Sequence, residues 1–186
     1  MDSNIAKNKK IIGLVGQTGA GKDEICEWIK KQHPDALFLR FSSPLSEALN
    51  IFCAEIKKED QQWLGQMLRT RFGDDVLAKA LEKKIVNAEN SVVVLNGIRY
   101  QVEADLVKKL GGELAFVFAD SKVRWERVSQ RHEKADDQGS YDNFLKLDQA
   151  PTEANILQIA QLADYKIDNG GSLENLHEQI NKIFHA

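Results

Sequence analysis

A short apolar segment that leads directly into a glycine-rich loop constrains this chain more than any other feature. Residues 11–15 read IIGLV, and residues 16–23 follow as GQTGAGKD. The spacing G-x-x-x-x-G-K between a strand and a helix is typical of a loop whose backbone N–H groups surround phosphate oxygens. Chance produces this spacing in roughly one chain in twenty of this size, so the flanking strand and helix carry the prediction. The sequence therefore predicts a polyphosphate site with Lys22 as its principal cation.

Asp23 departs from the usual form of this loop, which has serine or threonine after the lysine to bind Mg²⁺ through a hydroxyl group. A carboxylate at a helix N-terminus can cap free N–H groups. A carboxylate can also bind Mg²⁺ directly or through water. Both interpretations stay open, and both are compatible with triphosphate binding.

Length and composition indicate a single domain. The chain has 186 residues and a formal net charge of -3, which gives no overall attraction to nucleic acid. Cys26 and Cys53 lack ligand-like spacing, which favours a reducing compartment over a disulfide framework or a zinc site. The polar first ten residues and the short apolar segment after them match neither a signal sequence nor a membrane span. We expect a cytoplasmic protein that binds neither nucleic acid nor membranes, with its oligomeric state left open.

Short apolar segments alternate with longer amphipathic ones, a pattern typical of an α/β fold around a parallel sheet. The almost continuously apolar residues 92–95 and 114–119 indicate strands covered by helices on both faces. Strands are expected at 11–15, 36–40, 91–96, 114–119 and 164–168. Helices are expected at 22–32, 44–55, 59–69, 73–89, 100–110, 121–132 and 152–162.

Two C-terminal segments carry further expectations. Ser172 can cap a last helix, whose apolar stripe of Leu173, Leu176, Ile180, Ile183 and Phe184 is expected to face the core. Residues 133–150 lose helical periodicity between two helices. We interpret them as a candidate lid, with an ordinary surface loop as the alternative.

Several arginines lie where a phosphate site needs positive charge, because phosphoryl transfer depends on positioning and on neutralising charge. Arg124, Arg127 and Arg131 share one face of the helix before the candidate lid. That position favours a functional role over a solvated stripe. Arg99 follows the strand at 91–96, at the edge where open α/β sheets bind ligands. Its structural alternative is an ion pair with Glu103.

Long segments of the chain resemble a known group of enzymes. The deoxynucleoside monophosphate kinases of phage and bacteria are similar to IIGLVGQTGAGKDE, RFSSPLSEALNIF, LRTRFGDDVLAKAL and VVVLNGIRYQVEADLVKKLGG. Dephospho-coenzyme A kinases and archaeal kinase-like proteins are similar to VRWERVSQR and LDQAPTEANILQIAQLADYKIDNGGSLENL. The resemblance is to the P-loop nucleoside/nucleotide kinase group. It implies one three-layer α/β/α domain over residues 1–186, a five-stranded parallel sheet, a lid, ATP as phosphoryl donor, Mg²⁺ and a small nucleotide acceptor.

The resemblance also implies roles for individual residues. ATP would bind to Gly16, Gln17, Thr18, Gly19, Ala20, Gly21, Lys22, Asp23, Arg127, Asn169, Gly170 and Gly171. The acceptor would bind within a helical region, residues 41–90, and nearby, at Phe41, Ser42, Pro44, Arg69, Arg71 and Arg99. The catalytic residues would be Lys22, Arg131 and Arg99. Mg²⁺ would be held by Asp23 and Asn96.

The chain departs from this pattern at two further positions. Asn96 stands where many relatives have aspartate, and the Asp23 carboxylate would supply the missing charge. Ser46 stands where phage-type enzymes tend to have lysine, which affects the expected acceptor site.

The sequence as a whole predicts an ATP-dependent phosphotransferase that moves the γ-phosphoryl group to a nucleoside or deoxynucleoside monophosphate. One alternative is a dephospho-coenzyme A kinase, whose ribose hydroxyl acceptor needs a general base, with Asp23 as the candidate. The other is a nucleotide-binding regulatory protein with little transferase activity, which the combination of Asp23 and Asn96 supports.

Overall fold

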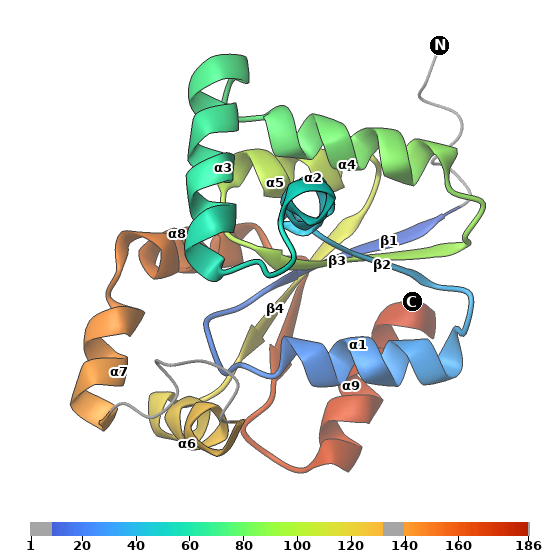
Figure 1. Cartoon of the computed structure of the whole chain (residues 1–186). Helices are drawn as coiled ribbons and strands as arrows, with labels where there is room; N and C mark the ends of the chain where they lie inside the picture. The colour runs from blue at the N-terminus through green and yellow to red at the C-terminus, as the bar shows by residue number, and fades with distance from the viewer. Residues whose placement is uncertain (1–8, 132–139, 186) are drawn as a thin grey trace.

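The computed structural model describes residues 9–131 and 140–185, and these residues form three layers (Figure 1). The middle layer is a five-stranded parallel sheet in the order β2-β3-β1-β4-β5. Its strands are β1 Lys10–Val15, β2 Leu37–Arg40, β3 Val92–Ile98, β4 Glu113–Phe118 and β5 Tyr165–Asp168. The described helices are α1 Lys22–Gln32, α2 Ser43–Phe52, α3 Lys58–Phe72, α4 Val76–Asn87, α5 Gln101–Lys109, α6 Ser121–Arg131, α7 Tyr141–Asp148, α8 Pro151–Ile159, the 3-10 turn η3 Ala160–Leu162 and α9 Leu173–His185.

Two apolar clusters, one on each face of the sheet, hold the layers together. Helices α4, α5 and α8 cover one face, where Leu81, Val107 and Ile156 are fully buried against β1 and β3. Helices α1 and α9 cover the other face, where Ile25 and Leu176 are buried. Strands buried on both faces must be apolar throughout, which is why β3 reads VVVLNGI. The predicted three-layer α/β/α fold with a five-stranded parallel sheet is confirmed.

The last helix begins where the sequence predicted. The Ser172 hydroxyl accepts a hydrogen bond from the Asn175 backbone N–H at 3.3 Å, which satisfies a free donor of the first turn. Leu176 and Ile180 of the predicted stripe are buried. Leu173 is 53% exposed, so its assignment to the core was wrong. Leu173 is the first residue of α9 and precedes the buried Leu176 by about one helical turn.

The candidate lid at 133–150 contains a helix that the sequence analysis did not predict. Residues 132–139 lie outside the described residues, and α7 occupies 141–148. The Ser140 hydroxyl caps α7 by accepting the Asn143 backbone N–H. Phe144 is 7% exposed and packs under the Arg124 guanidinium, 5.4 Å from it. A helix of two turns presents too few apolar residues for its periodicity to stand out in the sequence.

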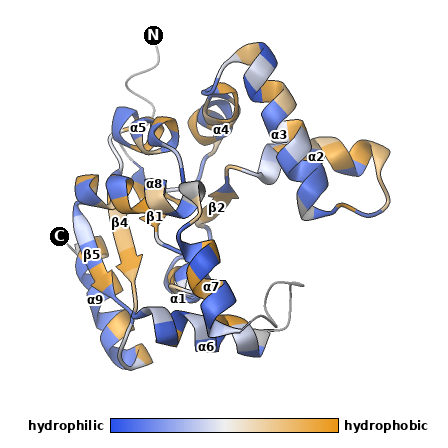
Figure 2. Cartoon of the chain, turned by 90° about the vertical axis from the view of Figure 1, so that its left-hand side faces the viewer, coloured by the Kyte–Doolittle hydropathy of each residue, from blue (hydrophilic) through white to orange (hydrophobic). Residues whose placement is uncertain are grey.

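Helices α2 and α3 form an arm on one side of the sheet (Figure 2). Large apolar side chains are exposed along it, with Phe52 84%, Trp63 62% and Phe72 62% exposed. Among the described helices, none is long and apolar enough to cross a membrane.

The sheet places the predicted site residues at one edge. In a parallel sheet all carboxyl ends lie at the same edge, where ligands bind in open α/β folds. Residues 16–23, which we call the phosphate loop, follow β1. Asn96 and Arg99 lie at the end of β3, α6 follows β4, and Asn169 follows β5.

Candidate active site

The phosphate loop has a left-handed backbone, which favours glycine, at two positions. Gly19 has φ of 80° and Gly21 has φ of 90°, and Gly21 is the N-cap residue of α1. A Cβ atom on Gly21 would lie 2.0 Å from Nδ2 of Asn169. The left-handed backbone, the start of α1 and the tight fit to the neighbouring loop together form the conformation that a phosphate cradle requires.

Lys22 folds back over this loop. Its ammonium group donates hydrogen bonds to the backbone carbonyls of Gly16 at 2.7 Å and Gln17 at 3.1 Å. Desolvation by burial, and then the positive charge of Arg99, lower the pKa of Lys22 from 10.5 to about 8. A bound phosphate would place further negative charge beside this buried ammonium and favour its protonated form.

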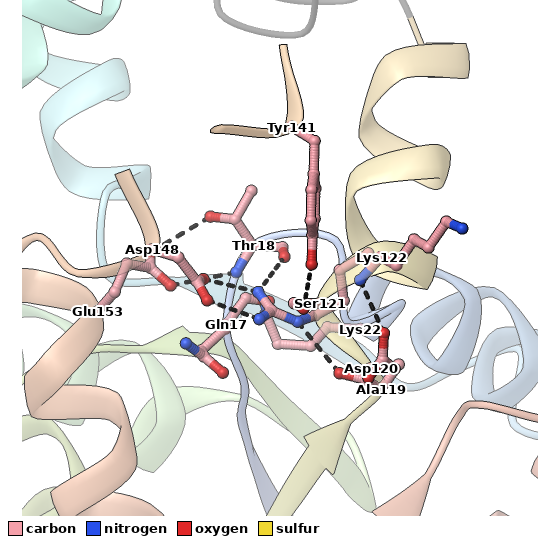
Figure 3. A network of polar contacts seen from close by, with 11 residues as sticks. Gln17, Thr18, Lys22, Ala119, Asp120, Ser121, Lys122, Tyr141, Asp148 and Glu153 are labelled. Carbon is pink, nitrogen blue, oxygen red and sulfur yellow. Dashed lines mark hydrogen bonds and ion pairs between the residues drawn. The ribbon is translucent and has the colours of Figure 1, made fainter. Parts of the chain in front are cut away.

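Glu153 of α8 reaches the phosphate loop and was not predicted from the sequence (Figure 3). Its carboxylate accepts the Thr18 backbone N–H at 3.2 Å and the Thr18 hydroxyl at 3.3 Å. It also accepts a hydrogen bond from Arg99 Nη1 at 3.1 Å. Its side chain is 7% exposed, whereas that of Arg99 is 41% exposed. The one signal in the sequence was a lone acidic residue in the first turn of a predicted helix, which ordinarily lies in solvent.

Arg99 does not form the ion pair with Glu103 that was the structural alternative for it. Glu103 does not pair with its guanidinium but accepts the backbone N–H groups of Arg99 at 2.8 Å and Tyr100 at 3.2 Å, at the start of α5. Burial raises the pKa of Glu103 from 4.5 to about 7, although these two backbone hydrogen bonds act against the rise. The guanidinium is thus directed toward the phosphate loop instead of along α5.

Arg124 is a structural residue, which corrects the expectation that the arginines of α6 act as one functional set. It is 4% exposed and forms two hydrogen bonds of 2.7 Å with the carboxylate of Asp148. It also donates to the backbone carbonyls of Thr18 and Ala119, each at 3.2 Å. Through these contacts Arg124, a residue of α6, joins the phosphate loop to α7.

Arg127 lies between the phosphate loop and the loop after β5. Its Nη2 donates to the Asn169 carbonyl at 2.8 Å, and Asn169 Nδ2 donates to the Ala20 carbonyl at 2.8 Å. Arg127 Nη1 is buried and has no hydrogen-bond acceptor among residues 9–131 and 140–185. Gly170 and Gly171 are exposed beside Asn169. An unpaired buried donor beside the phosphate loop is the feature expected of a side chain that contacts a bound nucleotide.

Arg131 is the last residue of α6. Its side chain lies outside what the structure describes, so its catalytic role stays a prediction.

Asp23 and Asn96, the two predicted metal ligands, are in direct contact. Asn96 Nδ2 donates to Asp23 Oδ1 at 2.8 Å, and Arg40 donates to the same oxygen at 2.6 Å. The N-cap residue of α1 is Gly21, and the Asp23 carboxylate accepts hydrogen bonds from the side chains of Asn96 and Arg40, which favours the metal-ligand interpretation over a helix cap. Asn96 Oδ1 is buried and lacks a donor within the described part of the chain. Both side chains line a cavity of 340 Å³ together with Arg40 and Ser43.

Asp23 and Asn96 suit a cation whose other ligands are supplied by water or by the substrate. In the described residues there is no group of three or more His, Cys, Asp or Glu side chains that could hold a metal ion. Mg²⁺ bound to nucleotides commonly uses one or two protein oxygens, and the unpaired amide oxygen beside a carboxylate provides them.

The residues predicted to bind the acceptor lie in different environments. Phe41 is 5% exposed and packs in the apolar core, so its assignment to acceptor binding is corrected. Ser42 and Pro44 begin α2 and are half-buried near the sheet edge. Arg69 lies over the Tyr100 ring at 4.8 Å, and Arg71 is exposed on α3. A phenylalanine after a strand looks the same in the sequence whether it faces a ligand or the core, because only packing distinguishes the two.

Ser46, which stands where phage-type relatives tend to have lysine, bonds within the arm. Its hydroxyl donates to the Ser42 carbonyl at 3.3 Å and accepts from Gln61 Nε2 at 3.1 Å. It joins α2 to α3 and provides no positive charge for an acceptor.

Comparison with known proteins agrees with the fold. No protein-family model matches the chain. A UPF0200 protein of Saccharolobus islandicus is 23% identical over 178 residues, with 94% of this chain and 92% of the relative covered. A UPF0200/UPF0201 protein of Archaeoglobus fulgidus is 31% identical over 179 residues, which cover 94% of this chain and 54% of the relative.

Solved structures are similar over nearly the whole chain. The protein TT1252 from Thermus thermophilus superposes with a TM-score of 0.61 at 20% identity, covering 96% of this chain and 98% of that one. Shikimate kinase from Bacteroides thetaiotaomicron superposes with a TM-score of 0.63 at 15% identity, covering 95% and 97%. The structural likeness agrees with the resemblance stated from the sequence, and at such identities it shows the fold alone.

Proposed function

We propose that the protein is an ATP-dependent phosphotransferase that moves the γ-phosphoryl group to a nucleoside or deoxynucleoside monophosphate. The observation that carries the proposal is the convergence of three cations on the phosphate loop. Lys22 bonds to the loop itself, Arg99 reaches it through Glu153, and Arg127 reaches it through Asn169. Phosphoryl transfer requires this kind of charge around a polyphosphate. The cytoplasmic location expected from the sequence is part of the proposal.

The proposed reaction assigns a role to each of these residues. The loop amides and Lys22 hold the β- and γ-phosphates, for which Lys22 leaves the carbonyls of residues 16 and 17. An oxygen of the acceptor phosphate attacks the γ-phosphorus atom, and the bond from phosphorus to the β–γ bridging oxygen breaks to release ADP. The acceptor phosphate is already ionised, so no general base is needed. Lys22 and Arg99, with Arg131 as predicted, offset the charge of the transferred group.

Asp23 and Asn96 would hold Mg²⁺, because the buried Asn96 oxygen lacks a donor among the described residues and the Asp23 carboxylate is beside it. The ion would neutralise charge on the β- and γ-phosphate oxygens. A Mg²⁺ titration of nucleotide affinity in Asp23→Ala tests this assignment. We expect the apparent Mg²⁺ affinity to fall about tenfold, by analogy with the loss of one charged ligand. An unchanged titration would contradict the assignment.

A coupled assay for ADP release tests the proposed reaction. It uses ATP, Mg²⁺ and a panel of nucleoside monophosphates, deoxynucleoside monophosphates, dephospho-coenzyme A and shikimate. We expect turnover with a monophosphate and its loss in Lys22→Ala. Lys31→Ala, an exposed lysine in the last turn of α1, is the matched control and retains turnover. Turnover of dephospho-coenzyme A or shikimate alone would contradict the monophosphate acceptor.

A hydroxyl acceptor is a second candidate, which Glu153 favours. A hydroxyl group must lose its proton during transfer. Asp23 was the candidate base from the sequence, and the structure adds the buried Glu153 carboxylate beside Thr18. A nucleotide-binding regulatory protein with little transferase activity is the third candidate. Tight ATP binding by calorimetry, with no phosphate transferred to any acceptor of the panel, would favour it.

A further inference from the structure

We propose that Glu153 is the internal counter-ion that the negatively charged group of the acceptor replaces at Arg99. The second substrate therefore carries an anionic group, such as a phosphate, which binds to the Arg99 guanidinium. This inference rests on the proposed function and names the residue that selects the charge of the acceptor. Glu153 is a positioning residue in this arrangement, because it acts through Arg99.

The two oxygens of the Glu153 carboxylate have different partners. Oε2 accepts the Thr18 backbone N–H, whereas Oε1 accepts Arg99 Nη1 and the Thr18 hydroxyl. Arg99 can therefore leave Oε1 while Oε2 keeps its bond to the loop. The exposures agree with this exchange, since the side chain of Glu153 is 7% exposed and that of Arg99 is 41% exposed. Solvent, and hence a soluble anion, reaches the guanidinium and not the carboxylate.

Electrostatics explains why a carboxylate lies at this position. The positive charge of Arg99 lowers the pKa of Lys22, and the negative charge of Glu153 raises it. Without Glu153, the negative charge of Asp23, which raises the pKa of Lys22 less than Glu153 does, would be left to face two neighbouring cations in the ligand-free site. A phosphate on Arg99 supplies the same charge that Glu153 supplies before binding. When the acceptor phosphate replaces Glu153 as the partner of Arg99, both Arg99 and Lys22 still have a negative charge beside them.

The Glu153 carboxylate would have a different role if the acceptor were an uncharged alcohol. It would then remove the hydroxyl proton as a general base, and its loss would lower kcat. A counter-ion that competes with the acceptor acts on KM instead, because its removal makes Arg99 more available to the acceptor. The two roles of Glu153 are therefore separable by measurement.

Inorganic phosphate is the first probe, titrated into the full chain with and without a saturating non-hydrolysable ATP analogue and Mg²⁺. Binding is read from the midpoint of thermal unfolding and from calorimetry. We expect Glu153→Gln to bind phosphate about tenfold more tightly than the wild type, because a competing ion pair is removed. Arg99→Gln is expected to lose this binding in the analogue-saturated protein. Glu126→Gln, which removes the same charge from an exposed position on α6, is the control and stays at the wild-type value.

Steady-state kinetics with the acceptor found on the panel gives the second measurement. We expect Glu153→Gln to lower the KM for the acceptor about tenfold while kcat changes less than about threefold. A fall in kcat of about a hundredfold at unchanged KM would overturn the proposal and identify Glu153 as a base. Phosphate binding that is unchanged or weaker in Glu153→Gln would also overturn it.

The design separates this inference from the proposed function. Failure of the wild type to bind the ATP analogue refutes the proposed function, while the phosphate titration without nucleotide still compares Glu153→Gln with the wild type. Glu153→Asp is a second variant should Glu153→Gln fail to fold, because it keeps the charge and shortens the reach to Arg99. We expect it to tighten phosphate binding in the same direction, and no tightening would again count against the proposal.

Discussion

The affinity of the protein for ATP is expected to depend on pH through Lys22. Burial and the charge of Arg99 lower the pKa of Lys22 to about 8 in the ligand-free protein. A bound triphosphate favours the ammonium form and is expected to raise this pKa back toward the ordinary value of 10.5. Binding above pH 8 therefore takes up a proton. The dissociation constant is expected to be flat below this pH and to rise up to about tenfold for each pH unit above it.

The difference between the pKa of about 8 for Lys22 in the ligand-free protein and the ordinary value of 10.5 sets the size of the change in the dissociation constant. Between pH of about 7.5 and about 9.5 the dissociation constant is expected to rise roughly twentyfold. The nucleotide does not contribute to this rise, because terminal phosphate groups ionise near pH of about 6. Calorimetry in two buffers with different ionisation enthalpies measures the proton taken up, which should approach one per ATP at the upper end of the range.

Lys22→Arg is the matched control, since a guanidinium keeps its charge throughout this range. We expect its dissociation constant to be independent of pH, whatever its absolute value. A flat profile in the wild type, or an equal rise in Lys22→Arg, would refute the assignment of the titration to Lys22. The ligand-free protein offers a check of sign. The unfolded chain holds the lysine proton more tightly than the folded one, so this group makes the free energy of unfolding rise between pH 8 and pH 10.5.

Three further predictions concern stability and are measured by chemical denaturation. Gly21→Ala is expected to lower the free energy of unfolding by about 2 kcal/mol, because its φ of 90° and a neighbouring nitrogen 2.0 Å from the new Cβ oppose a side chain. Gly171→Ala meets no atom within 4 Å and is expected to be neutral, so an equal loss in both would contradict the argument. Asp148→Asn leaves the buried Arg124 without a charged partner and is expected to cost about 3 to 5 kcal/mol; a loss below about 1 kcal/mol would show that the pair is solvated. Glu103 has a pKa raised from 4.5 to about 7, so its contribution to stability is present below pH 4.5 and is lost as the pH rises through 7. Glu103→Gln should remove that part of the pH dependence, and an unchanged profile would assign it to other groups.

The sequence by itself determined the fold class and the location of the phosphate loop. Both depend on local patterns, namely continuously apolar strands, helical periodicity and glycines at fixed spacing before Lys22. Asn96 and Arg99 could also be placed at the right edge, because the carboxyl ends of parallel strands meet there. The helix at 141–148 was not predicted, because two helical turns contain too few apolar residues for a clear periodicity in the sequence.

Only the tertiary structure decided which side chains meet around the loop. Thr18 and Glu153 are 135 residues apart in the chain, and their hydrogen bonds exist because α8 packs against α5 and α7, in the apolar cluster that also contains Val15 of β1. Packing alone separated the buried Arg124, which pairs with Asp148, from Arg127, one nitrogen of which has no acceptor in the part of the chain that the structure describes. Spacing along one helix made these arginines equivalent. Burial and long-range charge pairing made them different, and neither quantity is encoded in a local pattern.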